Sequence, residues 1–183
     1  MSGGQPDVEL VITAPEPYGA ALAYRTRCRT TLGVLTQLLA QAQKYVVFAA
    51  PFLQSGYGLS DGPLAEAMRS ALQRGVNVDV VSTAQGLKTL NATRLQRDAQ
   101  GLLRLFQHYA NIEDERNIGS HAKFCIVDET WAYVGSANLT GPGLSRHLEM
   151  GLLVQGDVAR KIYECWTYSL EIGLFTPVDW LKM

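Results

Sequence analysis

Long apolar stretches are missing from this sequence. A helix that crosses a bilayer needs about 20 consecutive apolar residues, and no segment of the 183 residues approaches that length. The first residues, Met-Ser-Gly-Gly-Gln-Pro, also lack the basic segment and apolar run of a secretory signal. With 47% hydrophobic and 18% charged residues, the composition is that of a globular domain. The sequence therefore predicts a cytoplasmic protein without a membrane segment.

Cysteine is also scarce, and its spacing argues against two kinds of site. The three cysteines, Cys28, Cys125 and Cys165, are odd in number and far apart in the chain. They therefore form neither the close pairs of a zinc site nor the framework of a disulfide-rich secreted domain. We expect reduced, mostly buried thiols, and a catalytic cysteine is the less favoured alternative.

The chain lacks the overall positive charge that would point directly to a nucleic-acid-binding protein. Its formal net charge is −1. The charges are unevenly distributed, however, because residues 21 to 105 carry ten Lys or Arg against four Asp or Glu. A positive segment suits a polyanionic partner. Unevenly charged helix surfaces explain the same pattern, and charge alone does not decide between the two.

Apolar patterning alternates between the periods of strands and helices, and no internal repeat is present. Strands are predicted at 8–13, 45–50, 76–81, 102–106, 124–127, 131–134 and 150–154. Helices are predicted at 31–44, between Asp61 and Gly75, at 88–99, and from a capping Asp157 to Leu170, with residues 14–19 irregular. This alternation predicts an α/β fold, a mixed β-sheet flanked by helices on both faces. We assign residues 1–20 to an N-terminal tail with a short strand, and residues 21–183 to the domain.

The chemically informative segment begins at Ser120. If His121, Lys123 and Cys125 lie in one strand, alternation places their side chains on one face, and the apolar residues between them pack into the core. His121 and Lys123 would then be about 7 Å apart along the strand. An ammonium group neutralises phosphate oxygens, and an imidazole serves as nucleophile or acid. The pair therefore predicts chemistry at a phosphate.

A second polar group follows later in the chain. Ser136 and Asn138 are two positions apart, so in an extended chain their side chains would point to the same side. Gly135, just before them, has no side chain and would let the backbone approach a ligand closely. Their hydroxyl and amide can donate hydrogen bonds to phosphate oxygens, although Gly, Ser and Asn also favour turns. Glu149 begins an apolar run, where an acid needs a partner. It could hold one imidazole nitrogen of His121 and so determine which nitrogen attacks.

These residues together resemble a known signature. The pattern His121-Ala-Lys123, four residues, Asp128, then Gly-Ser-Ala-Asn at 135–138 resembles the motif of the phospholipase D superfamily. The stretch 8–17, the arginine-rich region and the Ser-Ala-Asn-Leu-Thr-Gly run also look similar to small phospholipase D-like proteins of bacterial defence systems, of the DISARM type.

The resemblance implies a phosphodiesterase that uses no metal and no other cofactor. His121 would be the nucleophile and form a phosphohistidine. Lys123 and Asn138 would bind the phosphate with help from Ser136, and Glu149 would orient His121. The expected substrate is a nucleic acid, with DNA favoured over RNA, which would make the protein an endonuclease.

Three other positions complete the expected site. Asp128 would be mainly structural, holding the loop of the motif. The superfamily often has Asn two residues before the acidic position, where this chain has His147, so the hydrogen bonding near the acid is open. We expect His147 to be structural, with substrate contact as the alternative. His108 has no Lys two residues later and is expected to be structural or a surface residue.

The chain carries one copy of the motif, whereas the implied mechanism needs a nucleophile and a separate acid that later acts as base. The second histidine must then come from another copy across a two-fold axis, so we expect a homodimer. Arg25, Arg27 and Arg29 are either the solvated start of a helix or a strip that contacts nucleic-acid phosphates. Other defence-system proteins are a further expected class of partner.

Three alternatives remain at this stage. A phospholipase D-type lipid hydrolase would use the same chemistry, although such enzymes usually have longer chains with two motifs. A non-catalytic or partner-dependent nucleic-acid-binding subunit of a defence complex would keep the fold and bind without cutting. A transphosphatidylating synthase is the least favoured. No membrane partner is expected.

Overall fold

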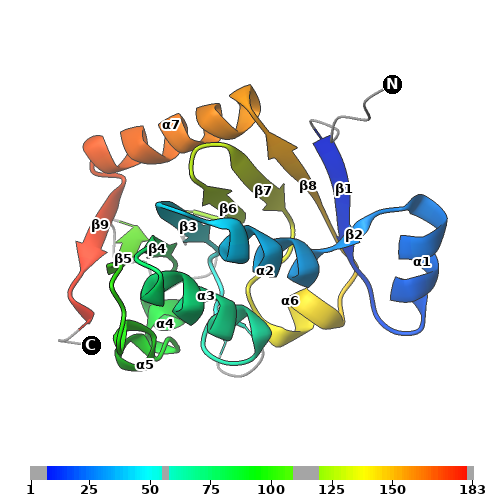
Figure 1. The fold of residues 1–183 in the computed structure, drawn as a ribbon, viewed down its shortest axis with the longest axis horizontal. Helices are drawn as coiled ribbons and strands as arrows, with labels where there is room; N and C mark the ends of the chain where they lie inside the picture. The colour runs from blue at the N-terminus through cyan, green and yellow to red at the C-terminus, as the bar shows by residue number, and fades with distance from the viewer. Residues whose placement is uncertain (1–7, 55–57, 109–119, 181–183) are drawn as a thin grey trace.

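The structure, a computed structural model, describes residues 8–54, 58–108 and 120–180. Its centre is a nine-stranded sheet with strand order β2-β1-β8-β7-β6-β3-β4-β5-β9 (Figure 1). The strands are β1 (Val8–Thr13), β2 (Arg29–Thr30), β3 (Tyr45–Ala49), β4 (Asn77–Val81), β5 (Leu103–His108), β6 (Phe124–Val127), β7 (Trp131–Gly135), β8 (Glu149–Gln155) and β9 (Phe175–Val178). The helices are α1 (Tyr18–Thr26), α2 (Thr31–Gln41), α3 (Pro63–Gln73), α4 (Ala84–Lys88), α5 (Ala92–Gln96), α6 (Gly141–Ser145) and α7 (Asp157–Glu171).

The sheet is mixed, as the sequence predicts. β3, β4 and β5 run parallel to one another, and their crossover connections contain α3 and the short α4 and α5. β6, β7, β8 and β1 continue from β3 as antiparallel neighbours. Because antiparallel neighbours run in opposite directions, the start of one strand lies beside the end of the next. This arrangement places several short loops at one end of the sheet.

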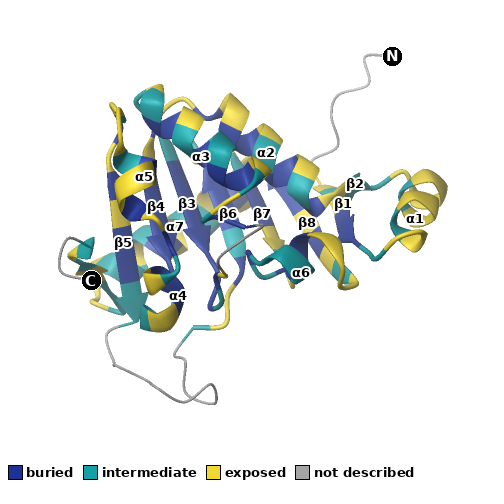
Figure 2. Ribbon diagram, turned by 90° about the horizontal axis from the view of Figure 1, so that it is seen from below, coloured by how far each residue is buried: buried dark blue, intermediate teal, exposed yellow. Residues whose placement is uncertain are grey.

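Helices cover both faces of the sheet, which confirms the predicted layers. α2 and α3 lie on one face (Figure 2), where Leu35 and Leu72 pack with Phe48 in the larger apolar cluster. α7 lies on the other face, where Trp166 packs with Ile126 in a second cluster. Among the described residues, no helix is both long and apolar enough to cross a bilayer.

A buried polar network fastens α7 to the sheet. The Trp166 indole donates a hydrogen bond of 2.9 Å to the Tyr45 hydroxyl, which in turn donates to Asp79. Arg104 donates two more hydrogen bonds to the Asp79 carboxylate, at 2.7 and 2.8 Å. Burial raises the pKa of Asp79, and the hydrogen bonds from Arg104 and Tyr45 oppose this shift. Moving α7 would leave buried polar groups without partners, which is costly. The network therefore fixes the position of α7.

Two predicted elements differ from the structure because of local capping. Of the helix predicted at 88–99, only α5 forms, since α4 ends at Lys88, and the Asn91 side chain accepts a hydrogen bond of 3.0 Å from the Arg94 amide to start α5. Asp157 is the first residue of α7 and not its cap, because Gly156 occupies the cap position.

Other elements were not predicted. The segment 14–19, predicted to be irregular, is partly helical because α1 begins at Tyr18. The structure also contains β2, α6 and β9, which are short and have weak apolar patterns. β1, assigned from the sequence to the N-terminal segment, is an internal strand of the sheet, between β2 and β8. The predicted tail at 1–7 lies outside the described residues.

Candidate functional site

The residues of the motif gather at one end of the sheet. His121 and Lys123 lie just before β6, Ser136 and Asn138 lie just after β7, and Glu149 is the first residue of β8. Since β6, β7 and β8 are antiparallel neighbours, these strand ends lie side by side. The structure therefore brings together residues that are up to 28 positions apart in the sequence.

His121 and Lys123 are closer together than predicted. They precede β6 and do not extend it, so the expected alternation does not apply to them. The Lys123 ammonium lies 3.1 Å from Nδ1 and 3.4 Å from Nε2 of His121, and it donates a hydrogen bond of 3.0 Å to the His121 carbonyl. The predicted separation along a strand is therefore wrong, and the two side chains are in contact.

The expected division of this strand into a core face and an outer face is also wrong. Cys125 and Val127, on the predicted outer face, are buried in the cluster beneath α2 and α3. Ile126, on the opposite face, is buried in the cluster beneath α7. Because helices cover both faces here, Cys125, Ile126 and Val127 are all buried, and Phe124 at the start of β6 is half-buried.

The two side chains of the pair have different environments. Lys123 is only 7% exposed, whereas His121 is exposed. Burial lowers the pKa of Lys123, and the negative charge of Glu149 opposes this shift. A partly desolvated cation interacts more strongly with an anion than a fully solvated one does. The pair therefore offers an accessible imidazole next to a sheltered positive charge.

Glu149 contacts residues other than the predicted His121. The Ser136 hydroxyl donates a short hydrogen bond to Oε2 of Glu149, and Nδ1 of His147 lies 3.9 Å from Oε1. The side chain of Glu149 is 14% exposed, while that of His147 is 64% exposed. Among the described residues, Glu149 thus positions Ser136 and faces His147. Orientation of His121 by Glu149 remains a prediction.

Gly135 has a packing role that sequence reasoning missed. Gly135 and Gly151 lie opposite each other on β7 and β8, and both lie against the ring of Tyr133. A methyl group on either glycine would lie 2.7 or 2.8 Å from Cζ of Tyr133, too close for carbon atoms. Burial raises the pKa of Tyr133, and the charge of Glu149 adds to the shift. The two glycines therefore make room for a buried tyrosine next to the Ser136–Glu149 pair.

Asn138 is partly buried between the end of β7 and α6. Its Oδ1 atom is buried and has no hydrogen-bond partner among the described residues. Buried polar groups are nearly always hydrogen-bonded. Phosphate oxygens only accept hydrogen bonds, so Oδ1 cannot bind one as placed; a flip that exchanges the two ends of the amide would put its NH₂ donor at this position.

Asp128 lies at the opposite end of β6 from His121. Its carboxylate accepts hydrogen bonds of 2.8, 2.9 and 2.9 Å from the backbone amides of Gln43, Lys44 and Tyr45. Asp128 also has a positive φ of 49° in the turn between β6 and β7, where aspartate is one of the better tolerated residues. The carboxylate therefore joins this turn to the loop between α2 and β3.

Replacement of Asp128 by Ala is expected to destabilise the fold by about 3 kcal/mol, because three backbone amides lose a charged acceptor. Chemical denaturation measures this loss, and Asp128→Asn, which keeps one carbonyl oxygen, should lose less. The folded fraction of either variant should retain its turnover number. Lost activity at unchanged stability would instead give Asp128 a direct role in the reaction.

The three arginines of the predicted phosphate-binding strip differ in their contacts. Arg29 donates hydrogen bonds to Glu9, at 3.4 Å, and to Gln37. Arg25 and Arg27 are exposed and have no hydrogen bond or ion pair among the described residues. Only these two are available to a polyanion, at the end of a helix that projects from the edge of the sheet (Figure 1).

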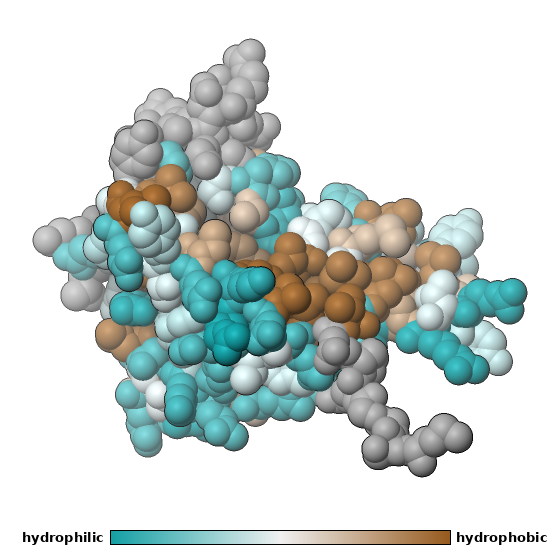
Figure 3. Space-filling view, turned by 90° about the horizontal axis from the view of Figure 1, so that it is seen from above, coloured by the Kyte–Doolittle hydropathy of each residue, from teal (hydrophilic) through white to brown (hydrophobic). Residues whose placement is uncertain are grey.

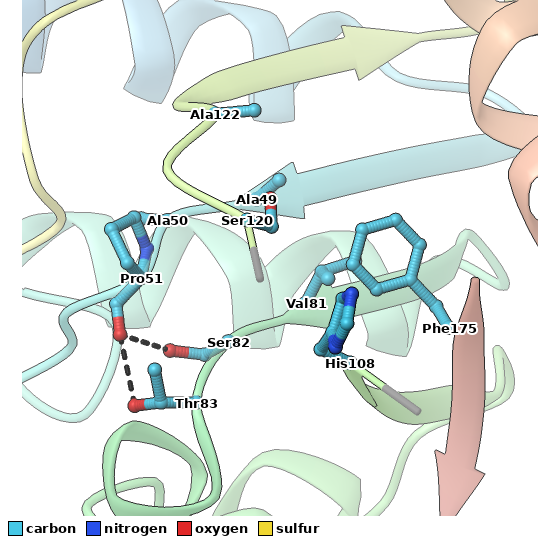
Figure 4. A pocket seen from close by; sticks show the side chains of 10 residues that line it. All are labelled: Ala49, Ala50, Pro51, Val81, Ser82, Thr83, His108, Ser120, Ala122 and Phe175. Carbon is cyan, nitrogen blue, oxygen red and sulfur yellow. Dashed lines mark hydrogen bonds between the residues drawn. The ribbon is translucent and has the colours of Figure 1, made fainter. Parts of the chain in front are cut away.

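His108 lines a small pocket beside the motif (Figure 4). Its ring meets that of Phe175 edge-on, with centroids 6.2 Å apart. The hydroxyls of Ser82 and Thr83 donate to the Pro51 carbonyl at 3.1 and 3.0 Å, so they hold the loops at the ends of β3 and β4 together. The remaining lining residues are Ala49, Ala50, Val81, Ser120 and Ala122. The loop that carries His121 thus forms one wall of this pocket.

In residues 8–54, 58–108 and 120–180, no three His, Cys, Asp or Glu side chains lie close enough together to hold a metal ion. The metal independence implied by the sequence resemblance remains a prediction.

The chain is similar to a DISARM protein and to a cardiolipin synthase. The DISARM protein DrmC of Bacillus paralicheniformis is 28% identical over 184 residues, which cover 96% of this chain and 68% of that protein. Cardiolipin synthase B of Salmonella typhi is 30% identical over 123 residues, which cover 64% of this chain. The match covers only 27% of the length of that synthase.

The fold and a family model identify the family. The crystal structure of Nuc, a phospholipase D family member from Salmonella typhimurium, superposes with a TM-score of 0.64 at 17% identity and covers 96% of this chain and 99% of that one. A family model described as "Cardiolipin synthase, PLD-like domain" matches residues 35–169, the segment that runs from α2 to α7 and contains the whole motif. The protein therefore belongs to the phospholipase D (PLD)-like family.

Proposed function

We propose that this protein is a metal-independent phosphodiesterase that cleaves nucleic acid, DNA rather than RNA, through a phosphohistidine intermediate. The observation that carries the proposal is the contact between exposed His121 and buried Lys123. Ser136 and Asn138 lie at the adjoining strand end. An accessible nucleophile, a cation and two polar side chains at one place are the groups that phosphoryl transfer requires.

The reaction would proceed in two steps. A neutral His121 attacks the phosphorus, the bond from phosphorus to the leaving oxygen breaks, and a second imidazole gives that oxygen its proton. The same second imidazole then takes a proton from water, and the resulting hydroxide displaces His121 from the phosphorus. Lys123 stabilises the negative charge that builds on the phosphate oxygens, and Ser136 and Asn138 would donate hydrogen bonds to them.

The second imidazole would be His121 of another copy of the chain, in a site shared across a two-fold axis. The motif occurs once in this sequence, so one copy supplies one nucleophile and no equivalent acid. Two Lys123 side chains near the axis would then both stabilise the negative charge on the phosphate oxygens. We propose a homodimer for this reason.

Two observations support nucleic acid as the proposed substrate: the positive charge of one segment of the chain and the similarity of the chain to a DISARM protein. Residues 21–105 carry an excess of Lys and Arg, and DrmC, which matches almost the whole chain, is named a DISARM protein. We therefore propose a cytoplasmic role in bacterial antiviral defence, with other defence proteins as partners. The match to cardiolipin synthase B favours phosphatidyl chemistry as a second candidate.

A panel of labelled substrates tests the proposed activity. Single- and double-stranded DNA and RNA, and vesicles of phosphatidylglycerol, are incubated with the protein in excess EDTA. DNA should be cleaved at the rate seen without EDTA, because no step is routed through a metal ion. Activity that EDTA abolishes and Mg²⁺ restores would contradict the mechanism. Conversion of the lipid alone would favour the second candidate, and binding without cleavage would indicate a non-catalytic subunit.

Binding to DNA should weaken steeply as salt rises, and Arg25 and Arg27 should account for part of that dependence. Each phosphate contact contributes about 0.9 to the slope of log K against log salt. Replacing both arginines by Ala is therefore expected to reduce the slope by roughly 1 to 2 in a fluorescence-anisotropy titration. Arg97→Ala, which removes another exposed arginine, is the matched control. An unchanged slope would assign Arg25 and Arg27 to structure or to a protein partner.

A further inference from the structure

A pocket lies beneath α1, at the edge of the sheet. Its volume is about 420 Å³, which is within the range of small-molecule sites. The end of β1, α1, the start of α2 and α6 form its wall, and we call it the α1 pocket. Nine of its eleven lining residues precede residue 35, so most of the wall lies outside the segment that matches the family model.

The α1 pocket is close to the residues of the motif. Thr13, in its wall, pairs with Glu149 across β1 and β8, and Glu149 accepts the hydrogen bond from Ser136. Leu144 and Ser145, also in the wall, belong to α6, the helix between β7 and β8. β1 lies three strands from β6, a distance of about 14 Å. About four nucleotides span this distance at 3.4 Å each, and fewer do in an extended strand.

The wall of the α1 pocket suits a flat ring with apolar faces and polar edges. Ala20 and Ala23 on α1 leave room for such a ring, and Leu144 provides apolar contact from α6. Glu16 is the charged residue of the wall. Its Oε1 lies 3.7 Å from the place that a Cβ on Gly19 would take, so the carboxylate lies against the wall.

The Glu16 carboxylate is available to a ligand. It has no hydrogen bond or ion pair with any described residue. A carboxylate accepts hydrogen bonds and donates none, and the amino group of a nucleobase such as cytosine is a donor that Glu recognises. An apolar pocket with a free carboxylate in its wall therefore fits a base that bears an amino group.

A buried hydroxyl in the same wall also lacks a partner. Thr13 is only 5% exposed, and no described residue makes a hydrogen bond to its Oγ1. Buried polar groups are nearly always paired. A ligand in the α1 pocket can supply the missing partner once the Thr13 side chain turns to another staggered position.

The far end of α1 carries positive charge. Arg25 and Arg27 lie at the C-terminal end of this helix, which contains no acidic residue. Arginine binds phosphates, so these side chains can hold the backbone of a strand whose base enters the α1 pocket. Figure 3 shows apolar and hydrophilic surface side by side at the end of the molecule where α1 projects.

We propose that the α1 pocket binds an unpaired base of the substrate strand, and that Glu16 selects a base that bears an amino group. The inference rests on the proposed function, which identifies the ligand as nucleic acid. A base inside a duplex must first be turned out of the stack, at an energetic cost, whereas a single strand presents its bases freely. The α1 pocket therefore favours single-stranded DNA.

Strands of cytosine and of thymine test the role of Glu16. Cytosine has an amino group where thymine has a carbonyl oxygen. Single strands of about 12 nucleotides are titrated by fluorescence anisotropy against the His121→Ala protein, which should not cleave them. The cytosine strand should bind roughly 5-fold more tightly. Glu16→Gln should remove this preference, because the Gln amide can also donate to the thymine carbonyl.

Two further variants separate the pocket from general charge effects. Glu171→Gln is the matched control, because it removes the same charge from an exposed residue at the end of α7, far from α1 (Figure 1). It should leave the preference for cytosine unchanged. Ala23→Leu fills the α1 pocket and should reduce cytosine binding to the level of thymine. Since α1 has no buried residue, neither Glu16→Gln nor Ala23→Leu should change the circular dichroism spectrum.

The outcomes separate the pocket from the chemistry. Equal binding of both strands, or a preference that survives both Glu16→Gln and Ala23→Leu, would overturn the assignment. Displacement of the cytosine strand by an equal nucleotide concentration of free cytidine monophosphate would also overturn it. A preference that Glu16→Gln removes supports the α1 pocket even if the wild type cleaves no DNA. Cleavage of DNA with equal binding of both strands would overturn the pocket and leave the proposed function intact.

Discussion

Mixing the wild-type protein with an excess of His121→Ala is expected to suppress activity well below simple dilution. His121→Ala alone should be inactive, because the nucleophile is removed. A mixed dimer holds one imidazole and therefore has either the nucleophile or the acid. Loss of a general acid costs about 10²–10⁴ in rate, so the mixed dimer should be nearly inactive too. After subunit exchange, activity should follow the square of the wild-type fraction.

The control replaces the His121→Ala protein by the same excess of an unrelated protein, which cannot exchange subunits with the wild type. Activity in that mixture should fall only through dilution. His121 is exposed, so its replacement by Ala should leave the denaturation midpoint unchanged. Activity that falls in proportion to the wild-type fraction in the His121→Ala mixture would show that each copy holds a complete site.

The fold was largely predictable because its apolar patterns are strong. The continuous runs of β3 and β4 and the helical spacing in α2 and α3 indicated an α/β domain, and the structure contains all four. Most of the failures are elements too short to show an apolar period, and α5 and α6 begin at local side-chain caps, Asn91 and Thr140. α6 has five residues and contains Pro and three other small residues, so its pattern carries little information.

The sequence predicted which residues form the site but not how they are arranged in space. Residue spacing identified His121 and Lys123, whereas their contact depends on β6 beginning three residues later than His121, which alternation cannot reveal. The partners of Asp128 are backbone amides about 84 positions away and leave no local signal. The exposure of one face of β8 was equally hidden, because the run Met-Gly-Leu-Leu-Val has the same apolar pattern as a strand buried on both faces.

The most direct test of the proposed function is capture of the covalent intermediate on His121. The protein is mixed with DNA in EDTA, denatured within milliseconds in alkali, where a phosphorus–nitrogen bond to histidine survives, and analysed by peptide mass spectrometry. A nucleotide adduct should appear on the peptide with His121, and none should form with His121→Ala. Lys123→Met, which removes the neighbouring cation, should form far less adduct in the same time. Cleavage of DNA with no adduct on His121, or with an adduct on another residue, would contradict the proposed mechanism.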